Sequence, residues 1–238
     1  MAFVAPISAS EEERIERTAD GQSKYSRGGY PRSFSDRSFI VIRSLKPADF
    51  LTLANASCGT FAVFMCLNYL DTFRSQYIWA AFSVFPVALL LDLLDGYVAR
   101  RSRTHSALGT ELDSLADIIS FGVAPAVVAY TLGMRGGWDV PILMVFVACG
   151  IGRLARYNIT FGELSDSTGK VTHYQGTPIP STVILVAVLV LAFTMGKVHD
   201  ALWLGRVRVL GMEWHPLSLM FLASSWAMIS SRLRIPKP

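Results

Sequence analysis

Six long apolar stretches recur along the chain and constrain its fold more than any other feature. A helix needs about 17–25 mainly apolar residues to cross the hydrocarbon core of a bilayer. The chain is 52% hydrophobic and 17% charged, whereas a soluble domain has about 25% charged residues. The sequence therefore predicts an all-α, polytopic membrane helix bundle. The expected transmembrane helices cover residues 49–70, 77–95, 113–133, 138–157, 178–196 and 214–231.

The segment before the first apolar stretch has a different composition. Residues 1–38 are rich in Ser, Arg and Gly and contain no apolar run long enough for a signal peptide, so we expect a disordered segment. Residues 39–48 mix apolar side chains with Arg43 and Lys46. Two interpretations of residues 39–48 stand: an amphipathic helix on the membrane surface, and an ordered lead-in to the first span.

The basic residues of the loops predict the orientation, because Lys and Arg favour the cytosolic side of a membrane. Five of them lie in the connections 71–76, 134–137 and 197–213. A larger set lies in the N-terminal segment, in the connections after the second and fourth spans, and in the C-terminal tail. Both termini are therefore expected in the cytosol.

Four aspartates interrupt the apolar pattern at the end of the second span and the start of the third. Asp92 and Asp95 are spaced i, i+3, and Asp113 and Asp117 are spaced i, i+4, so each pair lies on one face of a helix. Two neighbouring helices would then direct four carboxylates at one point.

Four carboxylates in a medium of low dielectric repel one another unless cations neutralise them. Because only oxygen ligands are present, the pattern favours hard ions, and we expect two divalent cations, Mg²⁺ or Mn²⁺. Two alternatives remain: the aspartates pair with arginines or cap helices, or they bind the transported ion of a cation-coupled transporter.

These aspartates belong to a longer pattern, D-x2-D-G-x2-A-R-x8-G-x3-D-x3-D, which the chain matches at every fixed position. The matching residues are Asp92, Asp95, Gly96, Ala99, Arg100, Gly109, Asp113 and Asp117. The pattern resembles the signature of the CDP-alcohol phosphatidyltransferases. The resemblance implies a six-helix membrane domain over residues 49–238 that transfers a phosphatidyl group from CDP-diacylglycerol to a hydroxyl and releases CMP. It also implies a homodimer or higher homo-oligomer.

The resemblance also implies roles for individual residues. Asp92, Asp95, Asp113 and Asp117 would bind the metals, and Asp117 would act as the general base. CDP-diacylglycerol would be bound by Thr52, Asn55, Asp95, Gly96, Ala99, Arg100, Ser106 and Gly109.

The segment that bears on the acceptor alcohol is "RLARYN", followed by "GTPIPS". It resembles the phosphatidylserine synthase branch of the family, in its fungal form, and this implies L-serine as the acceptor and the endoplasmic reticulum as the location. Serine would be bound by Arg153, Arg156, Tyr157 and Asn158. Plain anchoring of the span by its arginines is the alternative, and a sister enzyme would use inositol or glycerol 3-phosphate. Membrane lipid is an expected partner, and nucleic acid is not.

Overall fold

The computed structural model describes residues 46–102, 107–165, 173–175, 177–230 and 234–236. The predictions for residues 1–45, among them the disordered segment, lie outside these residues. Within them the chain is almost entirely helical. The α-helices are α3 (Pro47–Thr72), α4 (Ser75–Ser102), α5 (Ala107–Asp117), α6 (Ala124–Thr131), α7 (Asp139–Ser165), α8 (Val183–Thr194) and α9 (Leu219–Ile229). A π-helical turn, η1 (Ile118–Val123), joins α5 to α6, and the 3₁₀ turns are η2 (Ile179–Thr182), η3 (His199–Ala201) and η4 (Pro216–Ser218).

Six helical segments of this fold coincide with the six predicted spans. Four described segments are long and apolar enough to cross a membrane: Pro47–Thr72, Ser75–Val98, Leu108–Thr131 and Asp139–Ile159. Two shorter apolar helices, Ile179–Thr194 and Pro216–Ile229, supply the remaining two. The prediction of an all-α polytopic membrane bundle is confirmed.

The first long helix begins two residues before the expected first span. Pro47 occupies the first turn of α3, where its missing N–H costs nothing, and the backbone N–H of Lys46 donates to Asp49 Oδ2 at 2.8 Å. The helix therefore begins at Pro47, and not at residue 49. Pro47 and Ala48, assigned above to the segment 39–48, belong to α3.

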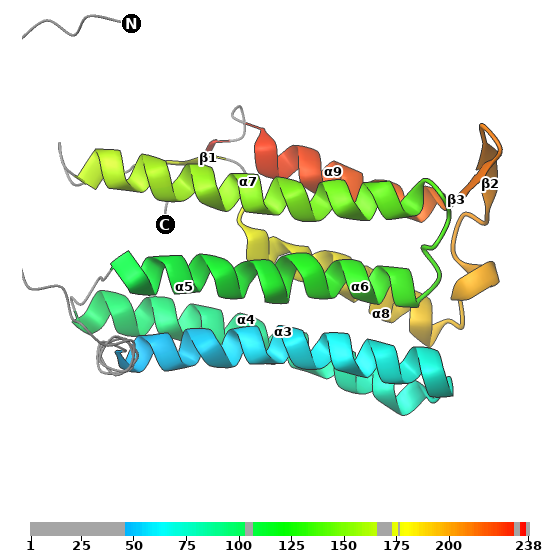
Figure 1. Ribbon diagram of the computed structural model, residues 1–238, viewed down its shortest axis with the longest axis horizontal. Helices are drawn as coiled ribbons and strands as arrows, with labels where there is room; N and C mark the ends of the chain where they lie inside the picture. The colour runs from blue at the N-terminus through cyan, green and yellow to red at the C-terminus, as the bar shows by residue number, and fades with distance from the viewer. Residues whose placement is uncertain (1–45, 103–106, 166–172, 176, 231–233, 237–238) are drawn as a thin grey trace, which may run out of the picture. The chain divides into compact units, whose positions relative to one another are not determined.

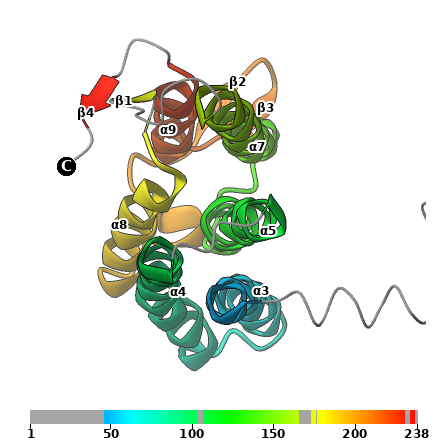
Figure 2. The ribbon, with the colours of Figure 1, turned by 90° about the vertical axis from the view of Figure 1, so that its left-hand side faces the viewer.

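The third span is the central helix of the bundle. In its most apolar window 56% of the residues are buried, against 28% in each of the other three long spans. Helix α3 packs against α4, α5 and α6, and α7 packs against α9. Figures 1 and 2 show the third span, formed by α5, η1 and α6, between the α3–α4 pair and the α7–α9 pair, with α8 beside α4 and α6.

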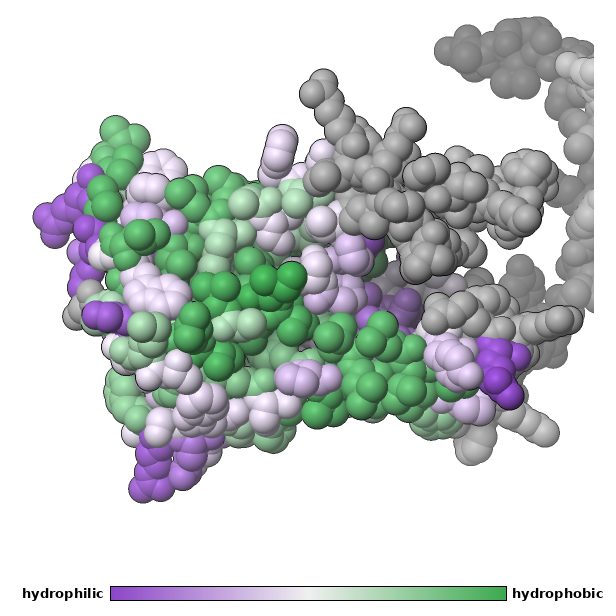
Figure 3. Space-filling model, turned by 180° about the vertical axis from the view of Figure 1, so that it is seen from behind, coloured by the Kyte–Doolittle hydropathy of each residue, from purple (hydrophilic) through white to green (hydrophobic). Residues whose placement is uncertain are grey.

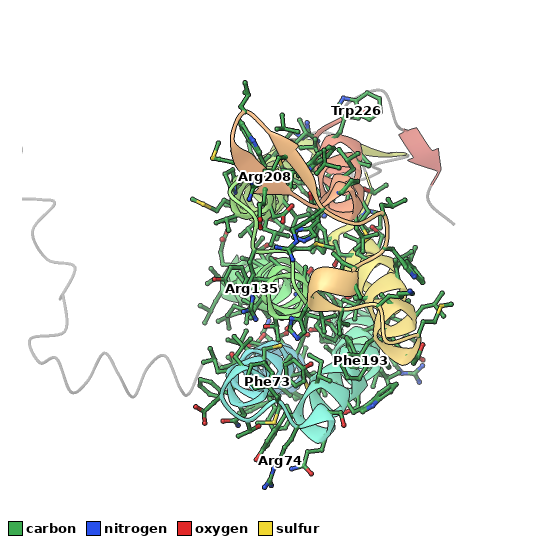
Figure 4. The ribbon with its side chains drawn as sticks, turned by 90° about the vertical axis from the view of Figure 1, so that its right-hand side faces the viewer. Phe73, Arg74, Arg135, Phe193, Arg208 and Trp226 are labelled. Atoms are coloured by element: carbon green, nitrogen blue, oxygen red, sulfur yellow. The ribbon has the colours of Figure 1, made fainter. Side chains whose placement is uncertain are left out.

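The bundle has two distinct ends (Figure 1). We call the end formed by the start of α3, the end of α4 and the start of α5 the aspartate end. The hairpin end, seen face-on in Figure 4, carries Arg74 and Arg135 on its loops and Arg208 on a short strand. The connections 71–76, 134–137 and 197–213, grouped on one side from their charges, thus lie together.

Four short strands were not predicted from the sequence patterns. Strands β2 (Val207–Val209) and β3 (Met212–Trp214) form an antiparallel hairpin whose turn residues, Leu210 and Gly211, have positive φ values of 51° and 80°. Strand β1 (His173–Gln175) pairs antiparallel with β4 (Arg234–Pro236). None of these strands alters the helical class of the fold.

The surface between the two ends is apolar, as Figure 3 shows for one face. Many large apolar side chains are exposed there, including Phe64, Met144 and Ile184 at 57%, 67% and 68%. Two apolar grooves of about 500 and 600 Å³ lie between α6 and α7 and between α7 and α9. An exposed apolar band of this kind is what lipid tails require.

Candidate active site

The structure brings the four aspartates of α4 and α5 to the aspartate end of the bundle. One carboxylate oxygen from each of Asp92, Asp95 and Asp113 lies within 4.8 Å of the others. Asp117, only 7% exposed, interacts electrostatically with all three. The predicted convergence of two helix faces is thus confirmed.

Helix α3 donates hydrogen bonds to this cluster of carboxylates. The Thr52 hydroxyl donates to Asp95 Oδ2 at 2.8 Å, and the Asn55 amide donates to Asp117 Oδ1 at 3.4 Å. Thr52 and Asn55 are 4% and 0% exposed. Because their side chains lie against the aspartates, the polar residues of the first span orient two of the four carboxylates.

The donor set fits a divalent cation. Asp113 Oδ1 is buried without a hydrogen-bond partner among the described residues, so an oxygen ligand is available in the interior. Three convergent carboxylates carry more negative charge than the interior tolerates, and no His or Cys side chain belongs to this group. Oxygen-only ligands select Mg²⁺ or Mn²⁺ over zinc.

The residues expected to bind the nucleotide are only partly visible. Gly96 follows Asp95 on α4, and Gly109 lies in the first turn of α5, both near the aspartates along the chain. Ala99 and Arg100 continue α4, which runs to Ser102, and the positions of their side chains are not described. Ser106 lies outside the described residues.

The four residues expected to bind serine face different neighbours. Arg153 is 8% exposed and interacts favourably with Asp117. Asn158 donates to Ser114 on α5 at 3.0 Å, while Tyr157 is 36% exposed. Arg156 donates to the carbonyls of Ile229 and Met228 at the end of α9, at 3.1 and 3.3 Å. Arg153 is thus the member of this set that faces the aspartates, and Arg156 links α7 to α9.

Two features near the site are missed by the sequence patterns. The π-helical turn η1 begins directly after Asp117, and Thr182 of η2 donates to the carbonyl of Phe121 inside it at 2.6 Å. The stretch "IISFGV" is uniformly apolar except for Ser120, so its periodicity gives no sign of a widened turn. The prolines of "GTPIPS" predict an irregular start of the fifth span, but not the contact that Thr182, the next residue, makes with Phe121.

Comparison with known proteins agrees with this geometry. The family model described as CDP-alcohol phosphatidyltransferase matches residues 45–228. The chain belongs to this family. Enzymes of the family depend in general on divalent cations, which is consistent with the carboxylate group on α4 and α5.

Several relatives carry names that specify the acceptor. The chain is 39% identical over 206 residues to the CDP-diacylglycerol–serine O-phosphatidyltransferase of Saccharomyces cerevisiae, covering 85% of this chain and 75% of the yeast protein. It is 38% identical over 142 residues to the enzyme of the same name from Helicobacter pylori, covering 59% and 55% of the two chains. It is 31% identical over 153 residues to the archaetidylserine synthase of Methanothermobacter thermautotrophicus, covering 63% and 58%.

Proposed function

We propose that the protein transfers the phosphatidyl group of CDP-diacylglycerol to the hydroxyl of L-serine, giving phosphatidylserine and CMP. The observation that carries the proposal is the convergence of Asp92, Asp95 and Asp113 within 4.8 Å, with Asp117 beside them. The family supplies the reaction class, and the names of the reported relatives supply serine.

The reaction needs a base and a stabilised leaving group. Asp117 accepts the proton of the serine hydroxyl as its oxygen forms a bond to the phosphorus that bears diacylglycerol. The bond from that phosphorus to the bridging oxygen breaks, and the bridging oxygen leaves with CMP. Asn55, which donates to Asp117 Oδ1, holds this carboxylate in a fixed direction. Arg100 neutralises charge on the diphosphate.

Asp92, Asp95 and Asp113 would hold one divalent cation and, with Asp117, a second, either Mg²⁺ or Mn²⁺. Such ions polarise phosphoryl oxygens and stabilise the charge that develops on a leaving group. Thr52 keeps Asp95 in place through its 2.8 Å hydrogen bond.

Substrate recognition is divided between the helices. The residues that would bind CDP-diacylglycerol are Thr52, Asn55, Asp95, Gly96, Ala99, Arg100, Ser106 and Gly109. Arg153 pairs with the serine carboxylate, since a guanidinium offers two parallel N–H groups to it. Arg156, Tyr157 and Asn158 complete the serine site.

Three further properties are part of the proposal. The protein resides in the endoplasmic reticulum, as the long polar N-terminal segment and the likeness to a fungal enzyme favour. Both termini face the cytosol, because the sequence has more basic residues in the N-terminal segment, the connections after the second and fourth spans and the C-terminal tail than in the connections 71–76, 134–137 and 197–213. It functions as a homodimer, as expected from the resemblance of its motif.

The test is an acceptor panel on purified protein in micelles. CDP-diacylglycerol and Mn²⁺ or Mg²⁺ are supplied with serine, ethanolamine, inositol or glycerol 3-phosphate, and CMP release is followed. Serine should support turnover. Ethanolamine, which lacks the carboxylate, should be at least about 100-fold slower, because it offers no anion for the Arg153 guanidinium to bind. CMP release with inositol or glycerol 3-phosphate but not with serine would show that serine is not the acceptor.

A variant pair sharpens the serine site. Arg153→Gln should raise the KM for serine by about 10- to 100-fold, since a hydrogen bond to a charged group contributes about 1.5–3 kcal/mol. Arg74→Gln, on the hairpin end (Figure 4), is the matched control and should leave this KM unchanged. An equal effect of both substitutions would remove Arg153 from the site.

A further inference from the structure

The helix that carries Asp117 changes its winding immediately after that residue. Helix α5 ends at Asp117, the π-helical turn η1 covers Ile118–Val123, and α6 continues from Ala124. Single π-helical turns inside α-helices are rare and occur frequently at functional sites. Because the turn contains an additional residue, it sets the direction of the helix face that carries Asp117.

Helix α3 approaches this turn closely enough to fix it. A Cβ placed on Gly59 would lie 2.6 Å from the Cα of Ser120 and 2.9 Å from its backbone nitrogen. Only glycine fits at such a distance from backbone atoms. Ser120 is itself 0% exposed. The two backbones therefore pack directly against each other, three residues after Asp117.

A closed set of contacts joins this packing to Asp117. The Ser120 hydroxyl donates to the backbone carbonyl of Asn55 at 2.7 Å, and the side chain of the same Asn55 donates to Asp117 Oδ1 at 3.4 Å. One residue of α3 is thus held by the π-helical turn through its backbone and holds the carboxylate through its side chain.

A second hydroxyl, from another element, also contacts the turn. Thr182 is 1% exposed, and its hydroxyl donates to the carbonyl of Phe121 at 2.6 Å. Widening of a helical turn disturbs the regular hydrogen bonds of its carbonyls, and Thr182 supplies a donor to one of them. Thr182 is the last residue of η2, which the extended Pro178 precedes, so the residue directly after "GTPIPS" reaches the turn behind Asp117.

We propose that Ser120 and Thr182 are positioning residues that hold η1 and, through it and Asn55, aim the Asp117 carboxylate at the acceptor hydroxyl. The proposal rests on the proposed role of Asp117 as the general base. It gives Thr182, the residue directly after "GTPIPS", an effect on catalysis without contact between Thr182 and the substrates. Neither residue belongs to the eight-position motif.

The test compares Ser120→Ala and Thr182→Val with two controls. Thr182→Ser keeps the hydroxyl and should restore activity. Ser225→Ala removes an equally buried hydroxyl, 3% exposed, that donates to the Phe221 carbonyl at 2.7 Å on α9. Ser120→Ala and Thr182→Val should lower kcat by about 10- to 100-fold, since a misplaced group costs up to about 100-fold. Ser225→Ala should change kcat by less than about 2-fold, because it disturbs no positioned group.

Further readouts separate positioning from simple loss of structure. In Ser120→Ala and Thr182→Val, the KM for CDP-diacylglycerol should stay within about 3-fold of the wild-type value. The shift of Tm on adding Mn²⁺ should stay within about 2 °C of the wild-type shift, because the other carboxylates are not displaced. Combining Ser120→Ala with Asn55→Ala should lower kcat no further than Asn55→Ala alone, since the two residues act in series. Additive losses, or losses equal to that of Ser225→Ala, would overturn the proposal.

The outcome is distinguishable from failure of the proposed function. Turnover is measured with whichever acceptor of the panel releases CMP, so a different acceptor leaves the comparison intact. Amide hydrogen exchange over residues 118–123 gives a readout that needs no activity. Exchange should rise in Ser120→Ala and Thr182→Val but not in Ser225→Ala. Unchanged exchange in the first two variants would show that these hydroxyls do not hold the turn.

Discussion

The two ends of the bundle each bury carboxylates, and they treat them in opposite ways. At the hairpin end, Asp139 is 0% exposed and accepts hydrogen bonds from the backbone N–H groups of Gly136 and His215, at 2.9 and 3.0 Å. Its second oxygen also contacts the His215 ring. At the aspartate end, three carboxylates crowd within 4.8 Å, and Asp113 Oδ1 has no hydrogen-bond partner among the described residues.

The difference separates a carboxylate that stabilises the fold from carboxylates that serve chemistry. Asp139 is surrounded by donors, so the free-energy cost of its burial is compensated. Its hydrogen bonds link the start of α7 to His215, the residue after β3. The aspartates on α4 and α5 repel one another, so the folded protein retains them at a cost in stability. Loss of a residue at the first end should therefore reduce stability, and loss at the second should reduce activity.

The largest effect is expected for Asp117→Asn. Asparagine keeps the shape but cannot accept the serine proton, so kcat should fall by about 10²- to 10⁴-fold, the usual contribution of general base catalysis. The Tm should stay level or rise, because one of four like charges is removed. CMP release and thermal unfolding in micelles measure the two. A lower Tm with intact turnover would show that Asp117 stabilises the fold and does not serve the chemistry.

Asp139→Ala should have the reverse signature. Two backbone N–H groups and the His215 ring then lose their acceptor, and the free energy of unfolding should fall by about 3–5 kcal/mol, as for other broken buried pairs. Turnover per folded molecule should be unchanged, because Asp139 lies at the opposite end of the bundle. Thermal unfolding and active-site titration of the folded fraction check both parts, and loss of turnover without loss of stability would contradict them.

Divalent cations should stabilise only one of the two ends. Mn²⁺ or Mg²⁺ at about 100 times its Kd should stabilise the wild type by about 2.7 kcal/mol. Asp113→Ala should abolish this gain, whereas Asp139→Ala should keep it despite its lower Tm. Chelation of the metal should end turnover. An equal gain in both variants would place the cation elsewhere.

The smallest effect is expected for Arg206→Ala on the β2–β3 hairpin. Arg206 pairs with Glu213 at 3.1 Å, but both side chains are well exposed, at 38% and 40%. Exposed pairs contribute about 0–1 kcal/mol, so the Tm should move by no more than a few degrees and kcat should not change. A large loss of stability would show that the exposed pair, and not only the buried Asp139, stabilises the hairpin end.

The sequence predicts much of this architecture because two periodicities are unambiguous. Apolar stretches of bilayer length identify six spans, and the spacings from Asp92 to Asp95 and from Asp113 to Asp117 place each pair on one helix face. Contacts between distant segments leave no such pattern. Nothing in the spacing of Arg153 and Arg156 indicates that the second donates to α9, 73 residues further along the chain. The π-helical turn is equally hidden, because it depends on the approach of Gly59 to Ser120.

The last helices of the chain are short in a way that affects the surrounding lipid. Helices α8 and α9 contain 12 and 11 residues, against 27 in α7. At 1.5 Å per residue they reach only about 18 and 17 Å. Even with the 3₁₀ turns before them they fall short of a hydrocarbon core of about 30 Å. A short apolar helix is accommodated by local thinning of the bilayer, by snorkelling of flanking residues or by oligomerisation. Of these, thinning costs less in a membrane with a core of about 27 Å, as in the reticulum, than in a plasma membrane of about 32–33 Å.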